Sequence, residues 1–186
     1  MLSLEQGKDL VKLAKDSIAA RLDNKHLVID DKIKEEFSHD QGCFVSLHLD
    51  SRLRGCIGFP EPIIPLWKAI AKAAQSAAFS DPRFSPLSKE EFEKVNIEVS
   101  VLTVPKKVEV SSPQEYLKKI KVGRDGLIIR GDYGSGLLLP QVPVELNWDI
   151  KEFLENLCMK AGLPENAWKS TDNKIYSFQA QVFAEK

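Results

Sequence analysis

The feature that most constrains the fold is a pair of alternating segments, 43–49 and 53–59, joined by only three polar residues. In the first segment, every second residue from Cys43 onward is apolar and falls on one face. Such alternation is typical of a half-buried β-strand. Parallel strands need a crossover of a dozen or more residues, so a link this short predicts an antiparallel hairpin.

The apolar rows also predict the register of this hairpin. Both rows must lie on one side of it, because a one-residue slip would turn a whole row towards water. A three-residue loop, 50–52, meets this condition by placing Leu49 opposite Leu53. The other face then carries two further pairs, His48 with Arg54 and Ser46 with Cys56.

The stretch LRGCIGFPEP at 53–62 therefore places a cysteine beside an arginine. A neighbouring guanidinium or imidazolium lowers the pKa of a thiol and makes it more nucleophilic. Glycine leaves the backbone open to close approach by a ligand. On this interpretation Cys56 is a candidate nucleophile, and Arg54, Gly55 and Gly58 are candidate substrate-binding residues.

A structural interpretation of the same stretch competes with this one, and the local residues alone favour it. Free cysteines are among the most buried residues, and a glycine in a strand often marks a bulge or a closely packed helix. Arg54 could pair with a structural carboxylate such as Glu61, and His48 could be a surface residue.

The rest of the chain predicts an α+β fold with mainly antiparallel sheet flanked by helices, because strands adjoin strands without a regular βαβ rhythm. With no linker or break in composition, we expect one continuous domain over 1–186. Capping boxes are expected at Ser88 with Glu91 and at Ser112 with Glu115. Helices are expected at 3–22, 65–79, 87–92, 112–120 and 147–161, and strands at 95–104, 125–140 (two strands around a turn) and 175–183.

Composition narrows the functional classes. Lys plus Arg number 26 and Asp plus Glu number 27, so no overall positive field indicates nucleic acid or an anionic membrane. The three cysteines form no CxxC and the three histidines are isolated, so we expect reduced thiols and neither a metal site nor a cofactor. The N-terminal stretch lacks the apolar region of a signal peptide, which favours the cytoplasm.

Three more residues are candidates outside the hairpin. Asp81 and Arg83 flank Pro82, so they could clamp a polar ligand, or pair and cap backbone in a fixed loop. Glu98 lies on one face of its strand, and a row of β-branched residues lies on the other face. It is either a buried acid–base group with a raised pKa or part of a solvated strand face. Cys158 lies among apolar helix residues and is expected in the core, so Cys56 should be alkylated faster than Cys158.

The ordered blocks LRGCIGFPEP, DPRFSP, IEVSVLT, KVGRDGLII, GLLLPQVPVE and FLENLCMKAGLP resemble the AMMECR family. The resemblance runs from about Gly42 to the end of the chain. It implies an α+β domain with two unequal lobes and an intracellular location, without an established activity. Relatives that occur beside a Memo-like protein, or fused to one, imply such a protein as a possible partner. His48 is outside the family pattern, so chemistry common to the family would use Arg54 and Cys56 without it.

Two functional hypotheses follow. The first is an enzyme, or the partner of an enzyme, whose cleft around Arg54 and Cys56 binds a small anionic molecule. The alternative is a non-catalytic module that binds a protein or a nucleic acid. Nucleic acid is the less favoured partner, because a charged helix end beside a turn explains the basic residues at 118–130 equally well.

Overall fold

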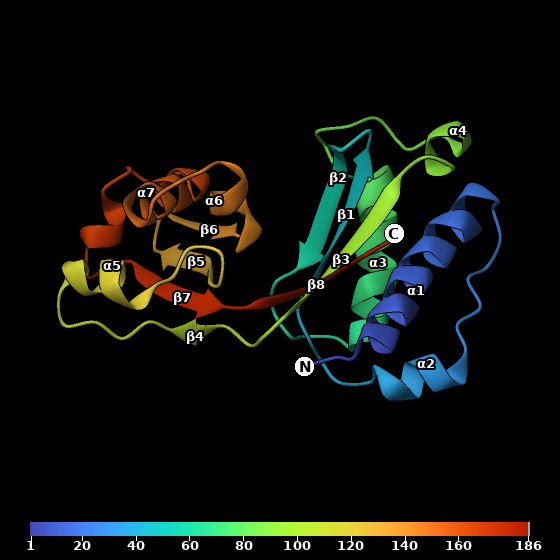
Figure 1. The fold of residues 1–186 in the computed structure, drawn as a ribbon, viewed down its shortest axis with the longest axis horizontal. Coiled ribbons are helices and arrows are strands. Elements are labelled where there is room, and N and C mark those ends of the chain that lie inside the picture. The colour runs from blue at the N-terminus through green and yellow to red at the C-terminus, as the bar shows by residue number, and fades with distance from the viewer. Residues whose placement is uncertain (186) are drawn as a thin grey trace. The chain divides into compact units, whose positions relative to one another are not determined.

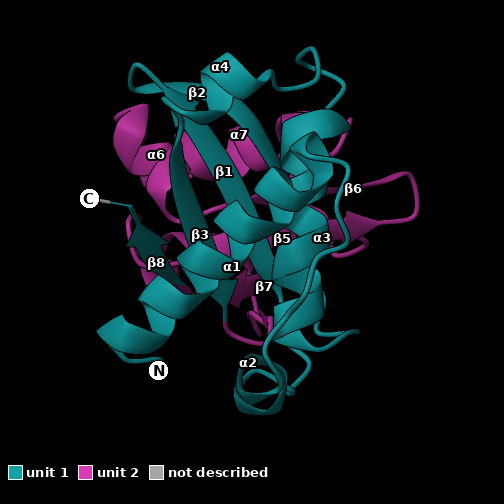
Figure 2. Ribbon diagram, turned by 90° about the vertical axis from the view of Figure 1, so that its right-hand side faces the viewer, with its two compact units in different colours: residues 1–102, 181–186 teal, residues 103–180 magenta. Residues whose placement is uncertain are grey.

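The computed structural model describes residues 1–185, which form two compact units. Unit 1 contains residues 1–102 and the C-terminal segment from Gln181, and unit 2 contains residues 103–180 (Figure 2). Each four-stranded sheet belongs largely to one unit, with strand orders β2-β1-β3-β8 and β4-β7-β5-β6 (Figure 1). Antiparallel pairing in both sheets confirms the predicted α+β class.

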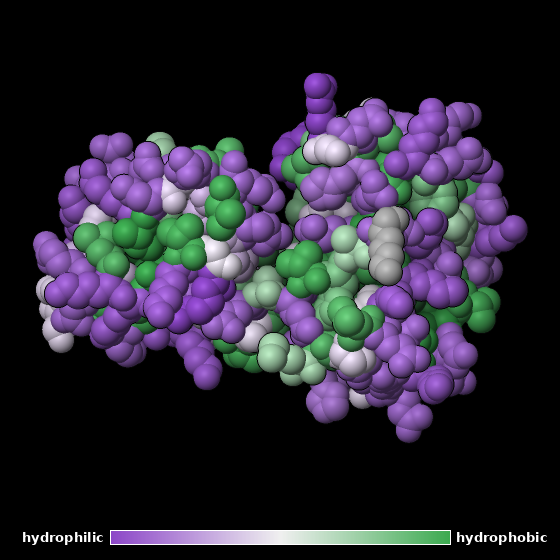
Figure 3. Space-filling model, viewed as in Figure 1, coloured by the Kyte–Doolittle hydropathy of each residue, from purple (hydrophilic) through white to green (hydrophobic). Residues whose placement is uncertain are grey.

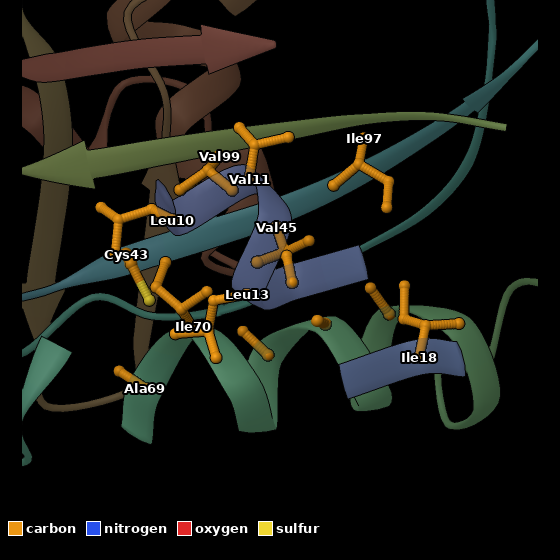
Figure 4. Close-up of a cluster of buried hydrophobic side chains, with 14 of the residues drawn as sticks. Leu10, Val11, Leu13, Ile18, Cys43, Val45, Ala69, Ile70, Ile97 and Val99 are labelled. Atoms are coloured by element: carbon orange, nitrogen blue, oxygen red, sulfur yellow. The ribbon is translucent and has the colours of Figure 1, made fainter. Parts of the chain in front are cut away.

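Unit 1 packs two helices against one face of its sheet. Apolar residues of β1 and β3, among them Val45 and Val99, meet those of α1 and of the alanine-rich α3 in one core (Figure 4). A capping box between Ser3 and Gln6 begins α1. The elements are α1 (Leu4–Leu22), α2 (Asp31–Glu36), β1 (Cys43–Leu49), β2 (Arg52–Phe59), α3 (Leu66–Phe79), α4 (Lys89–Phe92), β3 (Asn96–Leu102) and β8 (Ala180–Ala184).

Unit 2 has a core of its own. The apolar face of α7, including Phe153 and Leu157, packs against Leu127 and Ile129 of β5. Cys158 lies in this core with no exposed surface, as predicted. The elements are β4 (Lys106–Lys107), the 3-10 turn η1 (Pro113–Glu115), α5 (Tyr116–Lys119), β5 (Gly126–Gly131), β6 (Gly134–Leu138), α6 (Gln141–Glu145), α7 (Ile150–Lys160), η2 (Ala167–Lys169) and β7 (Lys174–Phe178).

The hairpin of β1 and β2 forms with a different loop from the predicted one. Its loop has two residues, Asp50 and Ser51, both with positive φ, as the favoured two-residue hairpin turns require. The predicted pairs Leu49–Leu53 and His48–Arg54 are therefore wrong, because Arg52 lies opposite Leu49 and Leu53 opposite His48. A bulge at Arg54 absorbs one extra residue of β2, which restores the predicted pairing of Ser46 with Cys56.

Two other expectations need correction. The segment 175–183 is not one strand but β7 and β8, which belong to different sheets. The break is at Gln179, which exchanges hydrogen bonds with Thr103: the Thr103 amide donates to the Gln179 carbonyl, and the Gln179 amide donates to Thr103 Oγ1. Ser112 does not cap a helix through its side chain, and a 3-10 turn precedes the short α5.

Hydrophilic side chains cover much of each unit in the view of Figure 3, and apolar patches are interspersed among these side chains. Within residues 1–185, none of the helices combines the length and the apolar composition that a membrane span requires.

Candidate functional site on the outer sheet face of unit 1

Three side chains form a row across the face of the unit 1 sheet that points away from α1 and α3, here called the outer face. Ser46 of β1 lies opposite Cys56 of β2 on one side and opposite Glu98 of β3 on the other. Directly opposed residues of antiparallel strands project to the same face, with Cβ atoms about 4.5–5.5 Å apart. Cys56 and Glu98 therefore lie on either side of Ser46, and we call the three residues the thiol row.

The thiol of Cys56 is partly buried and takes part in a hydrogen bond. The Ser46 hydroxyl donates to Cys56 Sγ over 3.2 Å. Burial raises the pKa of the Cys56 thiol, and it outweighs the Ser46 hydrogen bond and the charge of Arg83, which both lower it. The charges of Asp81 and Glu98 raise the pKa further. The predicted lowering of this pKa is therefore wrong in its net direction, and the thiol is protonated at neutral pH.

The loop of Asp81, Pro82 and Arg83 fastens the backbone of Cys56. Strand β2 is the first in its sheet, so one side of it has no neighbouring strand. There the Cys56 amide donates to Asp81 Oδ2 over 2.9 Å, and Arg83 Nη2 donates to the Cys56 carbonyl over 3.2 Å. The loop thus satisfies both backbone groups that an edge strand leaves open and fixes the position of the thiol.

Asp81 and Arg83 also bind each other. Arg83 Nε donates to Asp81 Oδ1 over 3.0 Å and Nη2 donates to Oδ2 over 2.8 Å. The Asp81 side chain is 1% exposed, whereas that of Arg83 is 50% exposed. The Arg83 guanidinium is the main cause that holds the pKa of Asp81 at about 2. These contacts match the fixed-loop alternative that the sequence left open for this pair.

Arg54 points to a different part of unit 1. As the extra residue of the bulge, it donates from Nε and Nη2 to both carboxylate oxygens of Glu91, over 2.9 and 3.0 Å. Its Nη2 also donates to the Ser85 carbonyl over 2.9 Å, and its guanidinium lies 5.7 Å from the Phe84 ring centre. The sequence correctly indicated a structural carboxylate as one alternative, but that carboxylate is Glu91 rather than Glu61.

Protein atoms fill the space beside Gly55 and Gly58, where the sequence predicted that a ligand could approach the backbone. A Cβ atom at Gly55 would overlap the Ala77 carbonyl oxygen of α3. At Gly58 it would overlap the Cys43 carbonyl oxygen and the Phe44 ring. The expectation that these glycines leave backbone open for a ligand is therefore wrong, and both instead permit close packing.

Sequence reasoning missed the role of Glu91, which it recognised only as part of a capping box. The structure contains that box, in which the Ser88 amide donates to Glu91 Oε2. The same carboxylate binds Arg54, so the cap of α4 and the bulge of β2 share one ion pair. Among residues 1–185, no cluster of three or more His, Cys, Asp or Glu side chains is arranged to hold a metal ion.

The depressed pKa of Asp81 predicts an acid-dependent loss of stability. Because the folded pKa of about 2 is below the ordinary value of 3.8, this carboxylate stabilises the fold above pH 3.8, and the contribution disappears as the pH falls through 2. We expect Asp81→Asn to lower the free energy of unfolding by about 2 kcal/mol at pH 5. Urea unfolding should show the difference from wild type shrinking towards pH 2. A difference that is the same at both pH values would contradict this.

Comparisons with known proteins place the whole chain among related sequences. The family model AMMECR1 matches residues 11–183. A protein from Methanocaldococcus jannaschii is 51% identical, with 100% of this chain and 92% of that protein covered. A protein from Nanoarchaeum equitans is 50% identical, with 95% and 99% covered. The crystal structure of an uncharacterized protein from Pyrococcus horikoshii, 47% identical, covers 98% of this chain and 92% of its own, with a TM-score of 0.93.

Proposed function

This chain belongs to the AMMECR1 family, and we propose that it binds a small molecule at the thiol row, where Cys56 meets the ligand as a neutral thiol. In this role it is an enzyme, or the partner that holds a substrate for one. A cytoplasmic location and a Memo-like protein as that partner belong to the same proposal.

The observation that carries the proposal is the contrast between Cys56 and the residues around it. Arg54, Gly55, Gly58 and Asp81 are all engaged by protein atoms. The Cys56 backbone is held on its open side by the Asp81–Arg83 loop, while the residue as a whole is partly exposed and its thiol meets the hydroxyl of the buried Ser46. A thiol fixed in this way is preorganised for a ligand, which lowers the entropic cost of binding.

Chemistry at this site would require a proton acceptor, because a neutral thiol is a weak nucleophile. Glu98 is the carboxylate of the thiol row, separated from Cys56 by the width of one strand. We assign it the acid–base role, with the proton of Cys56 relayed to Glu98 through the Ser46 hydroxyl or a water molecule as the sulfur displaces a leaving group from an electrophilic carbon. The Ser46 hydroxyl, already bonded to Sγ, orients the sulfur.

The test uses a series of neutral chloroacetamides with different side groups and mass-mapped alkylation of the native protein. A binding site makes the rate at Cys56 saturate with the concentration of at least one reagent. The same cysteine in urea-unfolded protein provides the control, with a linear dependence. A linear dependence for every reagent in the native protein would reject a small-molecule site and favour the non-catalytic binding module.

Glu98→Gln tests the acid–base role separately. The charge of Glu98 raises the pKa of Cys56, so removing that charge alone would accelerate alkylation. A slower limiting rate in Glu98→Gln, at unchanged half-saturation, is the result expected if Glu98 accepts the proton. Acceleration would limit Glu98 to an electrostatic effect.

A further inference from the structure

We infer that Arg83 binds a carboxylate or phosphate group of the ligand beside Cys56. This inference rests on the proposed function and deepens it, because it names the chemical class of the ligand. Of the two arginines that sequence analysis proposed for ligand binding, Arg54 and Arg83, it assigns the anionic group to Arg83.

The two arginines differ in what their guanidinium groups offer to a ligand. The Arg54 side chain is 11% exposed, and it uses Nε and Nη2 on Glu91. The Arg83 side chain is 50% exposed, and Asp81 takes the Nε and Nη2 edge. Its Nη1 makes no hydrogen bond to the residues that the structure describes, and with half of the side chain exposed this nitrogen is the donor left for a ligand.

The position of Asp81 makes Arg83 a preorganised donor. The carboxylate is almost completely buried and fixes the plane of the guanidinium through two hydrogen bonds. Arginine that is already held in this way loses little side-chain freedom on binding, and its remaining Nη1 group can donate charge-assisted hydrogen bonds to carboxylate or phosphate oxygens. The negative charge of Asp81 lies on the buried side, so a ligand meets the positive group first.

The same guanidinium is next to the reactive residue. Arg83 Nη2 lies 3.2 Å from the carbonyl oxygen of Cys56. Its charge also acts on the thiol, in the direction that lowers the pKa. A ligand that spans these two neighbouring residues can place an anionic group on Arg83 and an electrophilic carbon on Cys56 Sγ.

Iodoacetate and iodoacetamide test this directly, because they share a reactive carbon and a leaving group and differ in charge. Both form the S–C bond as iodide leaves and the thiol proton goes to solvent base. We expect the ratio of the iodoacetate rate to the iodoacetamide rate at Cys56 to be about fivefold higher in native protein than in urea-unfolded protein. Arg83→Gln should abolish that excess and Arg83→Lys should keep part of it. Added KCl should reduce it.

The matched control is Arg52→Gln, which removes an exposed arginine from β2, the strand that carries Cys56, and should leave the ratio unchanged. Because the ratio is taken within each variant, a moderate loss of stability does not affect it. Equal ratios in native and unfolded protein, or an excess that survives Arg83→Gln, would overturn the inference.

A second measurement distinguishes failure of the inference from failure of the proposed function. If neither reagent modifies native Cys56, the proposed function fails, and the role of Arg83 is decided by thermal unfolding with malonate. Malonate should then raise the Tm of the wild type but not of Arg83→Gln. The absence of that difference would overturn the inference.

Discussion

Gly55→Ala is expected to destabilise unit 1 by about 3 kcal/mol, the upper end of the usual cost of overpacking. The new methyl group would overlap the Ala77 carbonyl oxygen, which belongs to the backbone of α3 and cannot rotate away. Relief would require α3 to move from β2, although both Ala77 and the strand residue Leu47 are in the core. Urea unfolding of the two proteins measures the difference.

Gly162→Ala provides the control for this prediction. Gly162 ends α7 with φ +72°, and a Cβ atom there would meet no atom within 4 Å. Only the strain of the left-handed conformation remains, which costs about 1 kcal/mol. If both substitutions cost the same, the close approach of α3 to Gly55 is not what constrains this position.

Arg54→Ala should lower the free energy of unfolding by about 3 kcal/mol, because it leaves Glu91, its partner in a mostly buried ion pair, without a counter-charge. It also removes the donor to the Ser85 carbonyl and uncovers the Phe84 ring. Glu91→Ala should cost a similar amount, and the double variant should cost much less than the sum of the two. Thermal or urea unfolding of the four proteins gives the coupling energy.

An exposed ion pair offers the contrast. Lys12→Ala breaks the Lys12–Asp16 pair, whose side chains are 74% and 50% exposed, and should lower the free energy of unfolding by less than about 1 kcal/mol.

The iodoacetate preference of Cys56 should persist in Arg54→Ala. Full stability of Arg54→Ala together with loss of that preference would restore Arg54 to the ligand site.

The elements that depend on local patterns could be predicted from the sequence. Alternation identified β1 and β3, and the capping box at Ser88 formed as expected. The Ser46–Cys56 pair followed from keeping two apolar rows on one face. These features depend on neighbours in the sequence or on a single burial condition, which the residues themselves express.

The features that were missed depend on contacts between distant segments. The two-residue loop shifts the pairing of β2 by one residue, and the bulge at Arg54 shifts it back. The alternation of Cys43–Leu49 is therefore the same with or without these two features. The partner of Arg54 is 37 residues away in α4. The pKa of Cys56 depends on burial, which the neighbouring arginine does not reveal.

The stretch LRGCIG can therefore be understood as a scaffold that presents one side chain. The arginine ties β2 to α4, the first glycine admits α3 and the second admits the Phe44 ring. Cys56 is the residue of this stretch whose functional group lies on the outer face beside Ser46. The proposed site depends on that thiol being accessible and neutral.

Mass-mapped alkylation of the native protein by iodoacetamide, measured as a function of pH, tests this most directly. We expect Cys56 to react in the folded protein, with a midpoint above the ordinary thiol pKa of 9.0 because burial raises it. Cys43 and Cys158, which have no exposed surface, should stay unmodified until the protein unfolds. Modification of all three cysteines only after unfolding, or a midpoint for Cys56 below 9.0, would contradict an accessible neutral thiol at this site.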